Sequence, residues 1–212
     1  DPSNSCTAYP DNGGNPLVSV ATHLDFTDLL TCYDYWAPEY HELLPSGGSS
    51  KVGFEPFLYP VTMTTYTKEK FYVGASFTIG NLETLTFTGC DLVFAPGVEI
   101  TIESGGTLNI NPDVNNPITR SHLFSCDEMW QGIIVEDGGS LTINGQISGI
   151  SERFCTIQNA IKAVHLPGDP SGSSSDVIIR NTIFTDNLVS IYAKDCQVPG
   201  TSQISGNYFG VT

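Results

Sequence analysis

Acidic side chains are the first residues of this sequence whose type and spacing suggest a site. Glu103 and Glu136 occupy equivalent positions in two similar segments, and Asp137 follows Glu136 directly. If the segments stack, equivalent residues lie about 4.8 Å apart, where like charges repel unless solvent screens them or a cation bridges them. Because calcium prefers several oxygen ligands, these three carboxylates are candidates for a Ca²⁺ site. The alternative is solvent-screened surface charge, and no other cofactor is expected.

Arrangements that could support catalysis are sparse. Glycoside hydrolysis needs two carboxylates that face one groove, but the acidic pair Asp127-Glu128 consists of chain neighbours. Neighbours on a strand point to opposite faces. The four histidines are scattered without metal-ligand spacing, and no nucleophile–histidine motif or phosphate-binding loop occurs. The residues therefore favour a non-catalytic role and leave enzymatic activity open.

Six cysteines could form disulfides: Cys6, Cys32, Cys90, Cys126, Cys155 and Cys196. Their even number and wide spacing, with no CxxC pair, fit an oxidising compartment better than zinc binding. We favour the sequential pairing Cys6–Cys32, Cys90–Cys126 and Cys155–Cys196. Buried free thiols are the alternative.

Exposed aromatic rings could form a platform for carbohydrate. The candidates for ligand binding are Tyr33, Tyr35, Trp36, Tyr40 and Trp130. An aromatic residue next to an apolar strand also packs readily into a core. For each of these five residues, core packing is therefore the alternative to ligand binding.

An internal repeat indicates the elements that would position these residues. Residues 100–111 read ITIESGGTLNIN and residues 133–144 read IIVEDGGSLTIN, 33 positions apart, with seven of the 12 positions identical. Each copy alternates apolar and polar residues on both sides of a Gly-Gly pair. This period predicts half-buried strands, and glycine supplies the positive φ that a tight corner needs. A strand, a corner and a second strand at a fixed offset are typical of a solenoid.

Weaker copies extend the repeat in both directions. Cys90-Asp91 recurs as Cys126-Asp127, and residues 141–144 recur at 177–180, both at an offset of 36. Residues 179–184 resemble residues 204–209 at an offset of 25. These offsets predict coils of about 25 residues with external insertions at Pro112–Ser121 and Leu166–Ser175.

Composition and charge limit the class of partner. The chain has 8 Lys+Arg against 23 Asp+Glu, a formal net charge of −15, which argues against nucleic acid and anionic membranes as partners. No segment is apolar and long enough for membrane insertion. The composition fits a secreted protein that is extracellular or on the cell surface.

The first part of the chain differs from the rest, because residues 1–50 show no repeat. A solenoid needs its first apolar layer covered. We therefore predict an N-terminal cap or small accessory domain over residues 1–70 and a parallel β-helix over 71–212. The β-helix is expected to continue or dock beyond residue 212.

Residues 71–212 resemble a known group of repeats. The resemblance rests on the segments GCDLVFAPG (89–97), ITIESGGTLNI (100–110) and WQGIIVEDGG (130–139), with steps at Asn159 and Asn181. These segments resemble the pectate-lyase-like right-handed parallel β-helix repeats of large bacterial secreted surface proteins, especially those exported by the type IX secretion route. The resemblance implies an all-β, right-handed solenoid, but fold alone does not determine function.

These observations lead to three hypotheses about function. The first is a non-catalytic structural or adhesive module of a secreted bacterial surface protein, with the rest of a larger chain or neighbouring subunits as partners. The second is a carbohydrate-binding or polysaccharide-degrading β-helix, with surface glycans as partners. The third is a subunit that assembles into a fibre or filament.

Overall fold

The computed structural model describes residues 41–43, 49–51, 55–57, 59, 64–113, 120–126, 128–148, 151–168, 174–196 and 198–210. The described residues form strands and turns but no helix, so none of them belongs to a helix that could span a membrane. The chain divides into two compact units, Asp1–Phe57 with Lys70–Tyr72 and Leu58–Glu69 with Val73–Thr212. Each unit is described by itself.

The first unit contains two short strand pairs. Strands β1 (His41–Leu43) and β2 (Ser49–Lys51) pair antiparallel. Strand β3 (Glu55–Pro56) pairs in parallel with Phe71 and Tyr72 of β5 (Lys70–Val73). The rings of Phe57 and Phe71 meet edge to face with centroids 5.2 Å apart, which gives this part of the chain an aromatic contact of its own.

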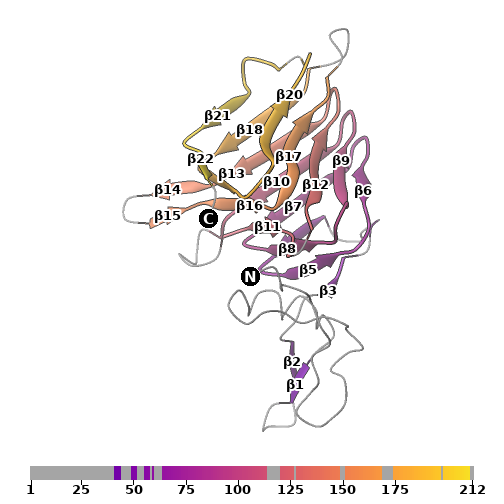
Figure 1. Cartoon of the computed structure of the whole chain (residues 1–212), viewed down its shortest axis with the longest axis vertical. Helices are drawn as coiled ribbons and strands as arrows, with labels where there is room; N and C mark the ends of the chain where they lie inside the picture. The colour runs from indigo at the N-terminus through magenta and orange to yellow at the C-terminus, as the bar shows by residue number, and fades with distance from the viewer. Residues whose placement is uncertain are drawn as a thin grey trace. The chain divides into compact units, whose positions relative to one another are not determined.

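The second unit consists of three parallel sheets (Figure 1). The first sheet holds β21 (Gln203–Ser205), β18 (Asp176–Arg180), β13 (Ser140–Asn144), β10 (Thr107–Asn111), β7 (Thr84–Thr88) and β4 (Thr65–Thr67), in that order. The second sheet holds, wholly within this unit, β22 (Tyr208–Gly210), β19 (Thr182–Thr185), β16 (Cys155–Gln158), β11 (His122–Phe124) and β8 (Asp91–Phe94). The third sheet holds β20 (Val189–Ala193), β17 (Ala160–Leu166), β12 (Trp130–Val135), β9 (Glu99–Ile102) and β6 (Phe77–Ile79).

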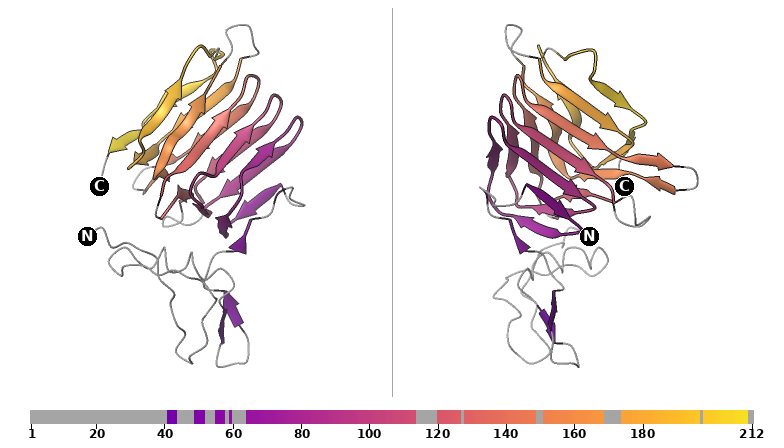
Figure 2. Two further views of the ribbon diagram at one scale, coloured as in Figure 1. Left: turned by 45° about the vertical axis from the view of Figure 1, so that its right-hand side comes forward. Right: turned by 180° about the vertical axis from the view of Figure 1, so that it is seen from behind.

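The chain visits the three sheets in a fixed order. It passes from the first sheet to the second and third, and then returns to the next strand of the first sheet. We call each such passage a coil, and Figure 2 shows successive coils lying side by side. The expectation of an all-β chain is confirmed for the described residues, and the three parallel sheets are consistent with a parallel β-helix.

Strand pairing confirms most of the predicted repeat. Leu108 pairs with Leu141 and Ile100 with Ile133, both at the predicted offset of 33. The offsets of 36 between β13 and β18 and of 25 between β18 and β21 are also confirmed. The predicted equivalence of Cys90 and Cys126 is wrong, because His122 pairs with Asp91 and sets an offset of 31 between β8 and β11.

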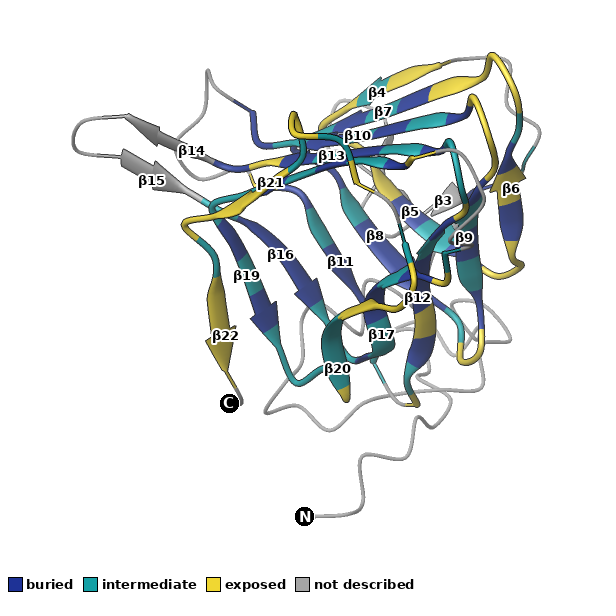
Figure 3. Cartoon of the chain, turned by 90° about the horizontal axis from the view of Figure 1, so that it is seen from above, coloured by how far each residue is buried: buried dark blue, intermediate teal, exposed yellow. Residues whose placement is uncertain are grey.

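Apolar columns fill the space between the sheets. Inward side chains of one coil lie over those of the next, and Figure 3 shows their buried positions along all three sheets. The columns are Leu85–Leu108–Leu141–Val177, Phe87–Ile110–Ile143–Ile179, Leu92–Leu123–Ile157–Phe184 and Ile79–Ile102–Val135. Burying each such side chain contributes roughly 1.5–3 kcal/mol, so the columns are the main source of cohesion between coils.

The Gly-Gly corners form as predicted, and each glycine has its own reason. Gly105 and Gly138 have φ values of 79° and 82°, which L-residues rarely adopt. Gly106 and Gly139 follow, and a Cβ on Gly139 would lie 2.8 Å from the Ile102 carbonyl oxygen. The first glycine of each pair therefore supplies the turn, and the second allows close approach to the backbone of the preceding coil.

Asparagines bind successive coils together at other corners. Asn187 accepts a hydrogen bond from the Ala160 N–H (2.8 Å) and donates one to the Ile157 carbonyl (2.9 Å) of the preceding coil. Asn207 repeats the arrangement with the Thr182 N–H and the Ile179 carbonyl. These contacts satisfy backbone groups that the corner takes out of the strand ladder.

Additional chain segments leave the coils between strands. The predicted insertions at Pro112–Ser121 and Leu166–Ser175 fall between β10 and β11 and between β17 and β18, although residues 114–119 and 169–173 lie outside the described residues. A further insertion, which was not predicted, is the antiparallel pair of β14 (Gln146–Ser148) and β15 (Ser151–Arg153). It separates β13 from β16 without breaking the order of the sheets.

The last described coil is more exposed than the coils before it. Ile204 and Phe209 are 56% and 58% exposed, whereas their partners Ile179 and Phe184 are fully buried. The rings of Phe184 and Phe209 stack at 5.3 Å, so the column continues into β22. The inward side chains of the last described coil are therefore less covered than those of the preceding coil.

Leu82 provides a test of the corner geometry. It occupies the position of Gly105 in the preceding coil, with a φ of 66°, and its side chain is 89% exposed. Replacing Leu82 with Gly removes left-handed strain without loss of packing. We expect the free energy of unfolding to rise by about 0.5–1 kcal/mol, measured by urea denaturation.

The control for this prediction is Leu188→Gly, because Leu188 is also exposed (70%) and does not have a positive φ. That change should lower the free energy of unfolding, since glycine gains freedom in the unfolded chain. Equal destabilisation by both substitutions would contradict the assignment of strain to Leu82.

Candidate functional site

Two predicted disulfides are not formed. Cys90, Cys155 and Cys196 carry free thiols, so the pairs Cys90–Cys126 and Cys155–Cys196 are wrong. Cys126 continues the register of β11 to a position five residues beyond Cys90 along the stacked strands. That offset is about 16 Å, whereas the Cα atoms of a disulfide lie within about 7 Å of each other.

Cys155 and Cys196 are separated by the fold in another way. Cys155 begins β16 of the second sheet, whereas Cys196 follows β20 of the third sheet and lies beside Gly168. Cys126 is disulfide-bonded, and its partner is none of the three free cysteines. Cys6 and Cys32 fall outside the described residues.

The two buried thiols have structural roles at the corner between the first and second sheets. Cys90 and Cys155 donate to the carbonyls of Thr88 (3.6 Å) and Ile110 (3.7 Å), and Ser121 in the coil between them donates to Asn111 (2.7 Å). Burial raises the pKa of both thiols, that of Cys155 to about 12. Both thiols therefore stay protonated and unreactive at neutral pH.

Trp130 is not a carbohydrate platform. Its side chain is fully buried, and its ring stacks on Phe94 with centroids 4.0 Å apart and planes at 10°. The indole N–H donates to the Gln158 carbonyl oxygen at 2.9 Å. The alternative of core packing is confirmed, because β12 begins at Trp130 and directs this side chain inward. Tyr33, Tyr35, Trp36 and Tyr40 lie outside the described residues.

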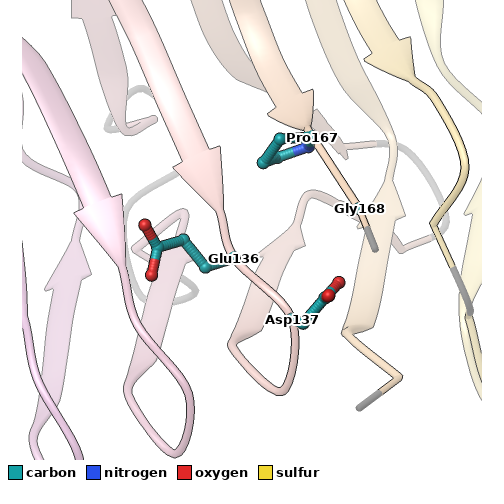
Figure 4. A pocket seen from close by; sticks show the side chains of 4 residues that line it. All are labelled: Glu136, Asp137, Pro167 and Gly168. Carbon is teal, nitrogen blue, oxygen red and sulfur yellow. The ribbon is translucent and has the colours of Figure 1, made fainter. Parts of the chain in front are cut away.

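The candidate calcium ligands lie in register, but they do not converge. Glu136 donates its N–H to the Ile102 carbonyl, which places it level with Glu103 in the preceding coil. Both glutamates are exposed, and Figure 4 shows the side chains of Glu136 and Asp137 pointing apart. Among the described residues, no group of three His, Cys, Asp or Glu side chains is placed to hold a metal ion. The calcium site stays a prediction without geometric support.

One irregularity interrupts the third sheet. Gly132 pairs with Lys162, but Ile133 pairs with Val164, so β17 bulges by one residue against β12. Gly132 has a φ of 110°, and a Cβ at this position would collide with the Lys162 carbonyl oxygen. Bulges redirect side chains and are common beside functional sites.

Three side chains meet on the outer face next to this bulge. The Lys162 ammonium lies 4.7 Å from the centroid of the Tyr192 ring, within range of a cation–π interaction. The His165 ring lies 5.3 Å from the Tyr192 ring at a tilt of 59°. Desolvation, followed by the charge of Lys162, lowers the pKa of His165 below its usual value. Its imidazole is therefore neutral at pH 7 and offers both a donor and an acceptor.

A shallow pocket lies at the end of the same strands. It has a volume of about 290 Å³ and is lined by Glu136, Asp137, Pro167 and Gly168 (Figure 4). Pro167 follows His165 by two residues, so the pocket and the Tyr192 ring are neighbours along β17. We call these seven residues the third-sheet site: Glu136, Asp137, Lys162, His165, Pro167, Gly168 and Tyr192. Sequence reasoning found the acidic pair but missed the others, because the bulge has no marker besides Gly132.

The outer face of the second sheet carries a more buried polar chain. His122 Nε2 lies 3.3 Å from Gln158 Oε1, and Gln158 Nε2 donates to Asp186 at 3.4 Å. The carboxylates Asp91 and Asp186 belong to coils three steps apart, about 14 Å at a coil spacing of about 4.8 Å. Paired glycosidase carboxylates lie about 5–9.5 Å apart, so these two do not form such a pair.

No protein-family model, curated protein or solved structure matches the chain. The resemblance to the pectate-lyase-like repeats of bacterial surface proteins therefore rests on the sequence segments alone and stays a prediction.

His122 should make the stability of the chain depend on pH. Desolvation, then the charge of Arg120, lowers the pKa of His122 from 6.5 to about 4. Between these values the unfolded chain binds more protons, so the free energy of unfolding falls as the pH falls. We expect a loss on the order of 2 kcal/mol from pH 6.5 to pH 4, measured by urea denaturation at several pH values.

The substitution His122→Gln should flatten this dependence. His165→Gln serves as the control, because His165 is more exposed and should contribute less. The same slope in wild type and His122→Gln would show that other groups cause the acid sensitivity.

Proposed function

We propose that the second unit is a right-handed parallel β-helix and that the chain is a non-catalytic structural or adhesive module of a secreted bacterial cell-surface or extracellular protein. The residues before the stack would act as its cap. The rest of a larger chain or neighbouring subunits would be its structural partners, and surface glycans are candidate ligands.

This proposal rests on the structural roles of the inward side chains and of the polar side chains at the corners. Apolar columns fill the space between the sheets. Polar corner residues such as Ser121, Asn187 and Asn207 bond to the backbone of their own or the neighbouring coil. The coils therefore serve as a rigid scaffold. Outward side chains lie on the faces of the three sheets away from the core, which suits display and adhesion.

An adhesion assay with a parallel turnover assay tests the proposal. Beads that carry the folded chain should be retained under flow on surfaces coated with polysaccharide or matrix protein. Beads that carry the heat-unfolded chain should wash off. Polysaccharide solutions incubated with the chain should gain no reducing ends and no ultraviolet absorbance from unsaturated sugars. Either product forming in proportion to chain concentration would replace the proposal with a polysaccharide-degrading function.

Assembly into a fibre is the second candidate, and the exposure of Ile204 and Phe209 favours it. A neighbouring copy that pairs with β21 and β22 would cover these side chains. We expect the sedimentation coefficient to rise with concentration and Ile204→Lys with Phe209→Lys to abolish the rise. Leu188→Lys is the control, because Leu188 is exposed but lies between β19 and β20 rather than in β21 or β22. A single species at all concentrations would exclude this candidate.

A further inference from the structure

We propose that the third-sheet site binds a neutral polysaccharide. This inference rests on the proposed adhesive function and names its ligand. The site lies on the outer face of β17 and β20, where Tyr192 is 38% exposed, and ends at the pocket lined by Glu136, Asp137, Pro167 and Gly168.

The bulge in β17 is a departure from the repeat beside this site. Other pairs of the third sheet keep a regular register, whereas β17 gains one residue against β12. The gain forces Gly132 to a φ of 110° and into close contact with the Lys162 carbonyl. A coil without the bulge would stack as its neighbours do. The bulge thus lies beside Lys162, the residue that reaches Tyr192 on the outer face, and bulges commonly redirect side chains next to functional sites.

Two neighbouring side chains hold the Tyr192 ring in place. Lys162 lies 4.7 Å from its centroid, and His165 lies 5.3 Å away on the adjacent strand. A fixed, partly exposed ring loses little entropy on binding and presents an apolar surface with a polar hydroxyl. The C–H faces of a pyranose ring complement such a surface.

The site also carries a set of polar groups that suits a sugar. Lys162 donates hydrogen bonds, Glu136 and Asp137 accept them, and neutral His165 does both. Sugar hydroxyls also donate and accept, so a polyhydroxylated ligand can use the whole set. Because Pro167 and Gly168 of the pocket directly follow the end of β17, two and three residues beyond His165, successive sugars of one chain can reach the ring and the carboxylates.

Charge selects a neutral polysaccharide over an acidic one. The chain carries a formal net charge of −15, and two carboxylates line the pocket. A polyanion would meet repulsion from both the local and the overall charge. A neutral chain of sugars meets neither.

Affinity electrophoresis on the full chain tests the proposal. Native gels would contain a neutral polysaccharide (dextran, galactomannan, xyloglucan or hydroxyethylcellulose) or an acidic one (alginate or polygalacturonate). The wild-type chain should be retarded by at least one neutral polysaccharide and by neither acidic one. Tyr192→Ala should raise the dissociation constant about tenfold, whereas Tyr192→Phe should keep most of the affinity.

Tyr208→Ala is the matched control, because Tyr208 is an exposed tyrosine on a different sheet and should bind as wild type. Circular dichroism and melting curves establish that each variant folds. No retardation by any neutral polysaccharide, retardation by the acidic ones alone, or equal loss in Tyr192→Ala and Tyr208→Ala would overturn the proposal. Bead retention on matrix protein without glycan binding would refute this inference and leave the adhesive function standing.

Discussion

In-register stacking of parallel coils is the constraint on which the rest of this structure depends. Each strand must present its apolar side chains at the level of those in the next coil, because a slip of one residue would turn them outward. The pairs Leu108–Leu141 and Ile100–Ile133 meet this condition on two different sheets. The corners follow from it, since the chain must change direction without disturbing the next level. Gly105 and Asn187 achieve this by different means, one through backbone conformation and the other through side-chain hydrogen bonds.

The sequence predicted the parts of the fold that repeat. The alternation around Gly105-Gly106 and its copy at residues 138–139 indicated both the strands and the corners, and the offset of 33 matches the observed register. The equivalence of Cys90 and Cys126 was wrong because a shared dipeptide carries little information, whereas the apolar alternation of β8 and β11 determines the register. The hairpin of β14 and β15 was missed because it interrupts the repeat and has no counterpart in the other described coils.

The candidate site was harder to predict than the fold, because its residues come together through an irregularity. Lys162 and Tyr192 are 30 positions apart and share no motif. Lys162 lies beside the extra residue in β17, which single-sequence periodicity does not reveal, and reaches Tyr192 on the next strand. For Trp130 the sequence predicted a possible site where there is none. Its residue type suggested a ligand platform, but its position at the start of a buried strand determined its role in the core. Residue type was thus a weaker guide to function than the place of a residue relative to the stack.

The unequal lengths of the coils affect how this protein can change in evolution. Equivalent residues of the first sheet lie 21 positions apart between β4 and β7 and 36 apart between β13 and β18, yet both pairs keep their register. Loop closure becomes only slowly more costly with length, so a coil can gain a segment outside the sheets with little penalty. Each outer loop can therefore be lengthened, shortened or exchanged independently of its neighbours. A lineage can therefore diversify the surface that it displays while the packed interior keeps its register.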